Sequence, residues 1–188
     1  MTGRACLIRA FIMNLAKAKT IEGWMSESEL EFLAQAAAKS QLIVEFGCYH
    51  GRSTRALADN TKGIVIAVDP WERDYPDNDG NILGIPMDVW DHFKQNLADK
   101  IHDGTVIPIH KRSTEFYMAS SPDFIFIDGD HRYETVKHDI LLGKQLLRNG
   151  GILAGHDYGH GYWPGVKTAV DELLPKFEVI DSLWWTNV

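Results

Sequence analysis

The chain alternates short apolar runs with stretches of helical periodicity, and this alternation constrains its fold more than any other feature. Five apolar runs of four to six residues are bounded by Gly, Asp, Pro or Asn, as buried parallel strands are. They lie at residues 42–46, 63–68, 106–109, 124–127 and 151–154. Helical stretches separate them at residues 53–59, 87–100, 114–119 and 133–147. Strands that alternate with helices form βαβ units, so we expect a doubly wound α/β domain.

The C-terminal end of the chain predicts a different last edge for the sheet. After a helix at residues 165–174, two strands at 177–180 and 183–187 are joined only by Asp181 and Ser182. That connection is too short for a parallel crossover and fits a hairpin. We therefore expect a Rossmann-like, mostly parallel sheet of seven strands that finishes with an antiparallel hairpin.

The chain is expected to fold as one compact domain with an N-terminal cover. Its 188 residues suffice for one hydrophobic core, and no repeat, low-complexity tract or Pro/Gly linker marks a boundary. Residues 1–39 are expected to form a helical cover and residues 40–188 the ligand-binding domain. The cover should contain an amphipathic helix at Ala5–Ala18. A second helix should run from a capping box at Ser26 or Ser28 to about residue 39.

Charge and cysteine content argue against several classes of function. A net charge of −7 disfavours polynucleotide binding, which needs clustered Lys and Arg. Cys6 and Cys48 form no metal-binding or disulfide pattern, so a reducing cytoplasm is expected. No apolar run reaches the ~18 residues that a membrane-spanning helix requires. The basic N-terminus faintly resembles a removed leader, but polar residues interrupt its apolar stretch. We expect a small-molecule partner, with the N-terminal helices as a cover or as a contact in a homo-oligomer.

The stretch VEFGCYHGRS, residues 44–53, follows the first predicted strand and spaces Gly47 and Gly51 four residues apart. In doubly wound sheets, ligands bind beyond the carboxyl ends of the strands, where the strand order reverses. The dinucleotide motif G-x-G-x-x-G lacks its middle glycine here, and no P-loop lysine follows. Glu45 would repel a pyrophosphate but suits the ammonium group of an amino acid. Ser53 can cap the next helix or donate its hydroxyl to the ligand.

The end of the second predicted strand adds a signal for a nucleoside. Asp69 lies 22 residues beyond Gly47, where an acid can accept hydrogen bonds from both hydroxyls of a ribose. Trp71 can stack on the face of an adenine. A nucleoside that carries an amino acid and no phosphate is S-adenosylmethionine (SAM), so we expect SAM at this loop.

These motifs resemble those of class I SAM-dependent methyltransferases. The resemblance lies in Glu45-x-Gly47-x-x-x-Gly51, Val68-Asp69-Pro70-Trp71, Ile127-Asp128-Gly129-Asp130-His131-x-Tyr133 and the run from Gly150 to Tyr158. It extends from about residue 40 to the C-terminus, and the last two motifs are similar to those of macrocin-type and cephalosporin-type O-methyltransferases. The resemblance implies a small-molecule acceptor that is methylated at a hydroxyl oxygen. It also implies that Ser113, which could equally cap a helix, contacts the adenine.

A metal site is a further implication of the resemblance. In related metal-dependent O-methyltransferases, an acid and a later adjacent pair bind a divalent cation, and Asp128 and the pair His156-Asp157 match them here. A bound cation lowers the pKa of an acceptor hydroxyl. Mg²⁺ prefers oxygen ligands, so the histidine suits Mn²⁺ or Zn²⁺ better, or His156 acts as a general base. Asp130 and His131 form an alternative acid–base pair, which could instead belong to a loop network that caps the next helix.

Residues 72–86 are too polar for a strand and too rich in Pro, Gly and Asn for a helix. A loop of this length usually serves as a lid or binding loop, so we expect it to cover the cofactor or acceptor. The aromatic loop around His160 is expected to shape the acceptor pocket. Two other functions stay open: an NAD-linked oxidoreductase on the same sheet, and a SAM-binding domain without catalysis.

Overall fold

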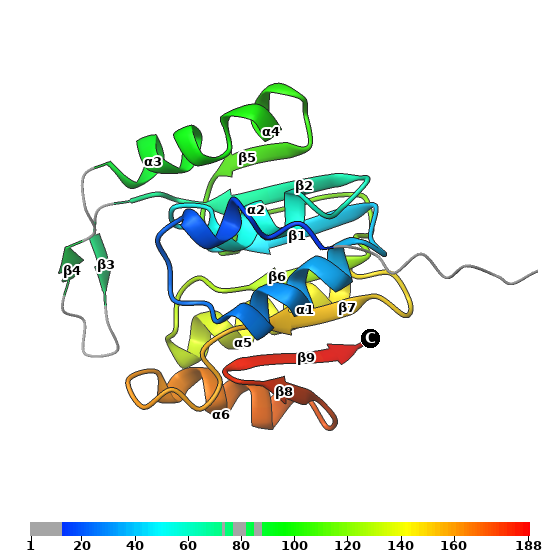
Figure 1. Ribbon diagram of the computed structural model, residues 1–188. Helices are drawn as coiled ribbons and strands as arrows, with labels where there is room; N and C mark the ends of the chain where they lie inside the picture. Colours follow the sequence, from blue (N-terminus) through cyan, green and yellow to red (C-terminus); the bar gives the residue numbers. More distant parts are fainter. Residues whose placement is uncertain (1–12, 73, 77–81, 85–87) are drawn as a thin grey trace, which may run out of the picture.

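The computed structural model describes residues 13–72, 74–76, 82–84 and 88–188. Its main sheet has seven strands in the order β5-β2-β1-β6-β7-β9-β8 (Figure 1). They are β1 (Leu42–Phe46), β2 (Ile64–Asp69), β5 (Val106–His110), β6 (Phe124–Ile127), β7 (Ile152–Gly155), β8 (Glu178–Ile180) and β9 (Leu183–Asn187). The strands from β5 to β7 pair in parallel, and β9 pairs antiparallel with both β7 and β8. The prediction of a doubly wound, mostly parallel sheet with a C-terminal antiparallel hairpin is confirmed.

Helices cover both faces of this sheet, which explains why its central strands are apolar throughout. The α-helices are α1 (Glu27–Ala37), α2 (Arg52–Ala58), α3 (Val89–Asn96), α4 (Ala98–His102), α5 (Tyr133–Leu146) and α6 (Pro164–Leu173). On one face, Ile43 shares a buried cluster with residues of α1, α2 and α3. On the other face, Val44 and Phe46 share a second cluster with α5 and α6. Strand alternation therefore decides which helices each side chain meets.

The topology places one functional edge at the carboxyl ends of the parallel strands. β1 lies between β2 and β6, so the strand order reverses at β1. The loops that leave β1, β2, β6 and β7 consequently meet at the same edge of the sheet. This edge carries most of the residues that the sequence motifs single out.

The N-terminal segment departs from the prediction at one helix and matches it at the other. The expected helix at Ala5–Ala18 lies partly outside the described residues, and its described part is irregular up to a short 3₁₀ helix, η1 (Ala18–Thr20). α1 begins after Ser26, whose hydroxyl accepts from the backbone N–H of Glu29 (3.2 Å), while the Glu29 carboxylate accepts from the backbone N–H of Ser26 (2.8 Å). The predicted capping box is confirmed, with Ser26 and not Ser28 as its first residue.

Other departures concern short elements. The predicted helix at 114–119 is only a 3₁₀ turn, η2 (Ser113–Glu115), because so few residues cannot sustain an α-helix without support. The predicted loop at 72–86 contains a two-stranded antiparallel ribbon, β3 (Asp74–Pro76) with β4 (Ile82–Gly84). The polar composition of this segment had argued against strands, but β3 and β4 pair with each other outside the main sheet. The expected role of this segment as a lid stays a prediction.

Among the described residues, no helix combines the length and the apolar content needed to cross a membrane.

Candidate active site

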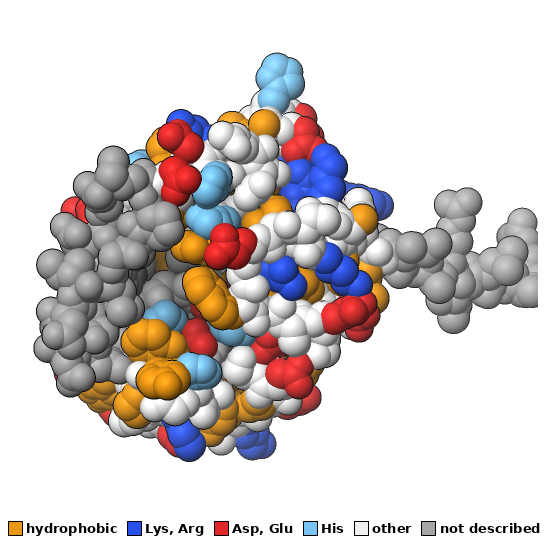
Figure 2. All heavy atoms as spheres, turned by 60° about the vertical axis from the view of Figure 1, so that its left-hand side comes forward, with side chains coloured by type: hydrophobic (Ala, Val, Ile, Leu, Met, Phe, Trp, Pro, Cys, Tyr) orange, Lys and Arg blue, Asp and Glu red, His pale blue; other side chains and the backbone are white. Residues whose placement is uncertain are grey.

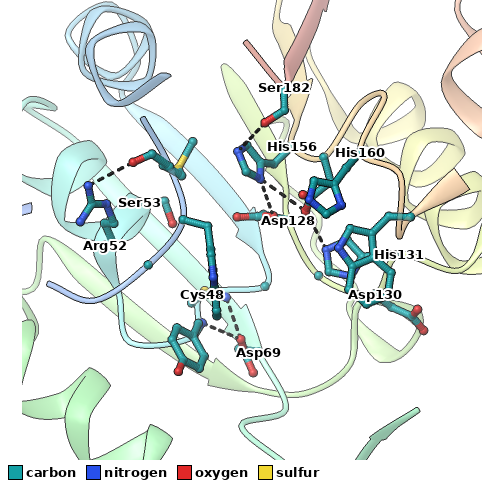
Figure 3. A pocket seen from close by; sticks show the side chains of 18 of the residues that line it. Cys48, Arg52, Ser53, Asp69, Asp128, Asp130, His131, His156, His160 and Ser182 are labelled. Atoms are coloured by element: carbon teal, nitrogen blue, oxygen red, sulfur yellow. Dashed lines mark hydrogen bonds and ion pairs between the residues drawn. The ribbon is translucent and has the colours of Figure 1, made fainter. Parts of the chain in front are cut away.

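A cavity of about 780 Å³ opens at the carboxyl ends of the parallel strands (Figure 3). Sites for small molecules usually have volumes of about 300–1,000 Å³. The predicted residues that line it are Gly47, Ser53, Asp69, Trp71, Asp128, His131, His156 and Asp157. Glu45, Gly51 and Ser113 are not among its lining residues. Figure 2 shows hydrophobic, histidine and acidic side chains gathered around a hollow on this face.

The two glycines of the first loop are required by packing. Gly47 has φ +85°, and a Cβ there would lie 2.2 Å from the carbonyl oxygen of Asp128. Gly51 has φ +89°, and a Cβ there would lie 2.3 Å from a methyl group of Leu97. The sequence indicated that the backbone approaches a ligand at these positions. In the structure it approaches the exit of β6 at Gly47 and the start of α4 at Gly51.

Asp69 organises the same loop. Its Oδ2 accepts from the backbone N–H groups of Cys48 (2.7 Å) and Tyr49 (3.1 Å), and its Oδ1 accepts from that of Trp71 (2.6 Å). Burial raises the pKa of Asp69, and these three donors act in the opposite direction. A carboxylate has about four acceptor positions, so one remains for a further donor. The predicted contact with the ribose stays a prediction, to which the structure adds a second role.

Trp71 closes one side of the cavity next to α3. Its ring packs against Trp90 (centroid separation 4.5 Å) and Phe93 (4.7 Å), and its Nε1 donates to the carbonyl oxygen of Tyr49 (3.2 Å). The ring is therefore held at a fixed angle. Its predicted stacking on the adenine is not tested by these contacts.

Glu45 does not occupy the predicted position beside a ligand. Its side chain is fully buried, because strand alternation turns it toward α2. Its Oε2 accepts from Oγ1 of Thr54 (2.5 Å), and its Oε1 has no partner among the described residues. The structure corrects the expected contact with an ammonium group: Glu45 is a buried carboxyl group beneath the loop.

Replacing Glu45 by glutamine should make the protein more stable at pH 8 but not at pH 5. Burial raises the pKa of Glu45 from 4.5 to about 8. The unfolded chain therefore releases this proton at a lower pH than the folded chain, and stability falls as the pH rises between these two values. At pH 7 the titration of Glu45 lowers the free energy of unfolding by roughly 3 kcal/mol relative to a side chain that stays neutral. Urea unfolding of both proteins at both pH values measures it.

The matched control for this pH series is Glu27→Gln, because Glu27 has a largely exposed side chain near the start of α1. That control should show no comparable gain at pH 8. A Glu45→Gln effect of equal size at both pH values would contradict the assigned titration.

Ser113 lines a second and smaller cavity of about 110 Å³. Gly47 and Gly129 line both this cavity and the larger one. The implied contact of Ser113 with an adenine stays a prediction, and the adjacency of the two cavities is consistent with it.

His156 lies at the centre of the site, directly after β7, and is buried. Its Nε2 lies 3.2 Å from Oε2 of Glu29 and 3.0 Å from Oγ of Ser182. Its Nδ1 lies 3.6 Å from Oδ1 of Asp128 and 3.4 Å from Oδ2 of Asp157 (Figure 3). Each ring nitrogen thus faces at least one carboxylate.

The charges around His156 fix its protonation state. Burial alone would lower the pKa of His156, but the surrounding carboxylates outweigh burial and raise the pKa to about 11. Burial has the opposite effect on a carboxyl group and would raise the pKa of Glu29. The contacts with His156, Ser26 and Ser182 outweigh burial and lower this pKa to about 2. The surrounding carboxylates thus favour the charged form of the ring. The predicted roles of His156, as a metal ligand or as a general base, stay predictions.

His131 lies beside the same carboxylates and is a second candidate for the metal site. Its Nε2 lies 2.9 Å from Oδ2 of Asp157, and its ring stacks on Trp163 with centroids 4.3 Å apart. Among the described residues, Asp128, His131 and Asp157 offer ligand atoms that lie within 4.8 Å of one another. Two carboxylates and one imidazole suit Mn²⁺ or a later transition ion better than Mg²⁺.

The hydrogen bonds described for Asp130 join it to Arg132 and Thr135. Its Oδ1 accepts from the backbone N–H of Arg132 (2.9 Å), and its Oδ2 accepts from Oγ1 of Thr135 (3.0 Å). These contacts tie Asp130 to the start of α5. The alternative interpretation, a loop network at the beginning of that helix, describes its position.

Two residues in the site carried no functional signal in the sequence. Glu29 was identifiable only as part of a capping box, and Ser182 only as a hairpin residue. Their contacts with His156 join positions 127 and 26 residues apart in the chain, which no local motif encodes. Trp24, an exposed aromatic residue that also lines the cavity, belongs to no motif either. Tyr162 lies in the predicted aromatic loop around His160, and both of these residues line the cavity.

Comparisons with known proteins agree with this geometry. Residues 44–158, more than half of the chain, match a family described as a methyltransferase domain. An uncharacterised protein of Acanthamoeba polyphaga mimivirus is 27% identical over 164 residues, which are 80% of this chain and 72% of that protein.

Solved structures share the fold. An O-methyltransferase from Bacillus cereus in complex with S-adenosylhomocysteine (SAH) has a TM-score of 0.65 at 16% identity, over 91% of this chain and 86% of that one. An O-methyltransferase from Streptomyces achromogenes involved in tomaymycin synthesis, in complex with SAM, has a TM-score of 0.64 at 15% identity, over 88% and 81%. Together with the family match and the loop geometry, these likenesses lead to one conclusion: the chain belongs to the methyltransferase-domain family and has the class I methyltransferase fold.

Proposed function

We propose that the protein transfers the methyl group of SAM to a hydroxyl oxygen of a small molecule. One observation carries the proposal: a single cavity has the glycine loop and Asp69 on one side and the group of Asp128, His131 and Asp157 on the other. The first side suits a nucleoside linked to an amino acid. The second side offers carboxylates and an imidazole to an acceptor. The structures of similar fold named above include O-methyltransferases, which supports oxygen as the methylated atom.

On the donor side, the backbone of the loop between β1 and α2 would bind the amino-acid portion of SAM. Asp69 would accept a hydrogen bond from the ribose while it holds the N–H groups of Cys48 and Tyr49. Ser53 lines the same wall and offers a hydroxyl. This arrangement fixes the methyl group relative to the acceptor side. Positioning of this kind supplies much of the rate in a direct displacement.

On the acceptor side, His131 would take the proton of the hydroxyl group. The Asp157 carboxylate, 2.9 Å from Nε2 of His131, orients that ring and stabilises its protonated form. Asp128 would orient the acceptor oxygen from the exit of β6. The same three residues also fit a divalent cation such as Mn²⁺, which when bound would lower the pKa of the acceptor hydroxyl.

A thermal-shift titration tests the donor side. SAH should raise the melting temperature, and NAD⁺, tested as the rival ligand, should leave it unchanged. At 100 times its dissociation constant, a ligand adds about 2.7 kcal/mol to the free energy of unfolding. For a protein of this size the expected shift is about 2–4 °C per kcal/mol. A shift with NAD⁺ alone, or with neither ligand, would overturn the proposed function.

An acceptor screen with SAM then separates an enzyme from a SAM-binding domain without catalysis. Release of SAH in the presence of a hydroxyl compound identifies turnover. EDTA should abolish turnover if a cation assists, and added Mn²⁺ should restore it. Turnover that persists in EDTA would assign the proton transfer to His131 and Asp157 without a metal.

A further inference from the structure

We propose that Glu29, on the N-terminal helix α1, is a positioning residue of the active site that acts through His156. The inference rests on the proposed methyltransferase function and extends it to a residue outside the segment that matches the family. Glu29 does not line the cavity. It contacts two residues that do line the cavity, His156 and Ser182.

The contacts of Glu29 hold its carboxylate in one place. Oε1 accepts from the backbone N–H of Ser182 (2.9 Å) and from its hydroxyl (2.8 Å). Oε2 accepts from the backbone N–H of Ser26 (2.8 Å) and lies 3.2 Å from Nε2 of His156. The side chain is 2% exposed. Both oxygens are thus occupied, and α1 is joined to the hairpin between β8 and β9.

A capping box alone does not require this arrangement. Capping needs only the contact between the Glu29 carboxylate and the backbone of Ser26, and such a carboxylate can remain in water. Burying a carboxylate costs free energy unless it is paired and hydrogen-bonded. The contacts with Ser182 and His156 supply that pairing. These two contacts are not part of the capping box, and both lead to residues of the active site.

The ring of His156 transmits this constraint to the acceptor side. Glu29 and Ser182 hold its Nε2, so the ring cannot rotate without losing these contacts. Its Nδ1 consequently stays beside Oδ1 of Asp128 and Oδ2 of Asp157, at 3.6 and 3.4 Å. Asp157 also holds His131. Glu29 therefore fixes the relative positions of the residues that would orient the acceptor and accept its proton.

The test compares Glu29→Gln and Glu29→Ala with the control Glu27→Gln on the exposed side of the same helical turn. Partners of this kind, which hold a functional residue in place, typically contribute 10–100-fold to activity. We expect kcat to fall about 10-fold in Glu29→Gln and about 100-fold in Glu29→Ala. The affinity for SAH should change less than about 2-fold, because the donor side does not contact Glu29. Glu27→Gln should match the wild type.

A spectroscopic readout separates positioning from a general loss of structure. In protein with ¹⁵N-labelled histidine, the Nε2–H proton of His156 should give a strongly downfield signal, because it is shared with Glu29 and Ser182. The signal should move upfield in Glu29→Gln and remain unchanged in Glu27→Gln. If Glu29→Ala does not fold, Ser182→Ala replaces it, with the same expected loss of kcat at unchanged SAH affinity.

The positioning role of Glu29 requires that kcat and the His156 signal change together. Variants at Glu29 that keep both kcat and the His156 signal would overturn the positioning role. Loss of kcat with an unchanged His156 signal would also overturn it. A wild-type protein that neither binds SAH nor turns over would refute the proposed function instead. In that case the His156 signal still reports whether Glu29 holds the ring.

Discussion

Replacing Gly47 by alanine should lower the free energy of unfolding by about 2–6 kcal/mol and abolish SAH binding. The backbone at Gly47 has φ +85°, a conformation that costs a non-glycine residue about 1–3 kcal/mol. In addition, the new Cβ would lie 2.2 Å from the carbonyl oxygen of Asp128 and 2.5 Å from Cα of Gly129. Both are backbone atoms, so relief requires the exits of β1 and β6 to separate. Overpacking of this kind typically costs a further 1–3 kcal/mol or more.

Gly104 provides the matched control for this substitution. Its φ is +81°, almost the same as that of Gly47, but a Cβ there would meet no atom within 4 Å. Gly104→Ala should therefore show the conformational cost alone and leave SAH binding intact. Urea unfolding and SAH calorimetry on the two variants measure the difference. Equal destabilisation in both would show that the close approach of the two loops does not contribute.

Replacing Asp128 by asparagine should reduce kcat/KM by about 10²–10⁴-fold without destabilising the fold. Asp128 is the carboxylate at the exit of β6, and it belongs to the group that faces the acceptor. The loss of an oriented acid–base or ligand group has an effect of this size. Burial raises the pKa of Asp128, although the charge of His156 opposes this. The neutral, isosteric side chain should therefore be tolerated, and the measurement is steady-state kinetics beside a thermal melt.

The control for Asp128 is Asp91→Asn, since Asp91 lies on the surface of α3 and pairs only with Lys94 among its described contacts. It should retain wild-type kinetics. SAH affinity should remain within a few-fold in Asp128→Asn, because the loop and Asp69 hold the donor side. Wild-type kcat/KM in Asp128→Asn would remove this residue from the mechanism. A large loss of SAH affinity with normal kcat would instead place Asp128 on the donor side.

The pattern of apolar residues was sufficient to predict the sheet. Periodicity is a property of the chain's own geometry: strands alternate every second residue, and buried parallel strands are apolar on both faces. The strands Leu42–Phe46 and Phe124–Ile127 have the bounds that the sequence predicted. The glycine loop and Asp69 were placed correctly at the functional edge for the same reason, because the end of a strand fixes where the next residues lie.

The short elements and the partners of buried charges were not predictable in this way. The segment after β5 has too few residues for propensity to decide its state, and packing leaves it as the turn Ser113–Glu115. His156 directly follows β7 and His131 lies four residues beyond β6, and neither position reveals which groups surround the ring. Their difference arises from their neighbours, which come from distant parts of the chain.

The fold class, the position of the binding edge and most of the acids at that edge could be predicted from the order of residues alone. Local periodicity and turn chemistry are sufficient for these features. The contacts and charge of the groups at that edge depend on tertiary packing. Glu29 reaches His156 because α1 packs beside β7, and Glu45 points away from the cavity because α2 covers its face of the sheet. The charge of a buried group depends on which partners surround it, and those partners are set by packing between segments far apart in the chain.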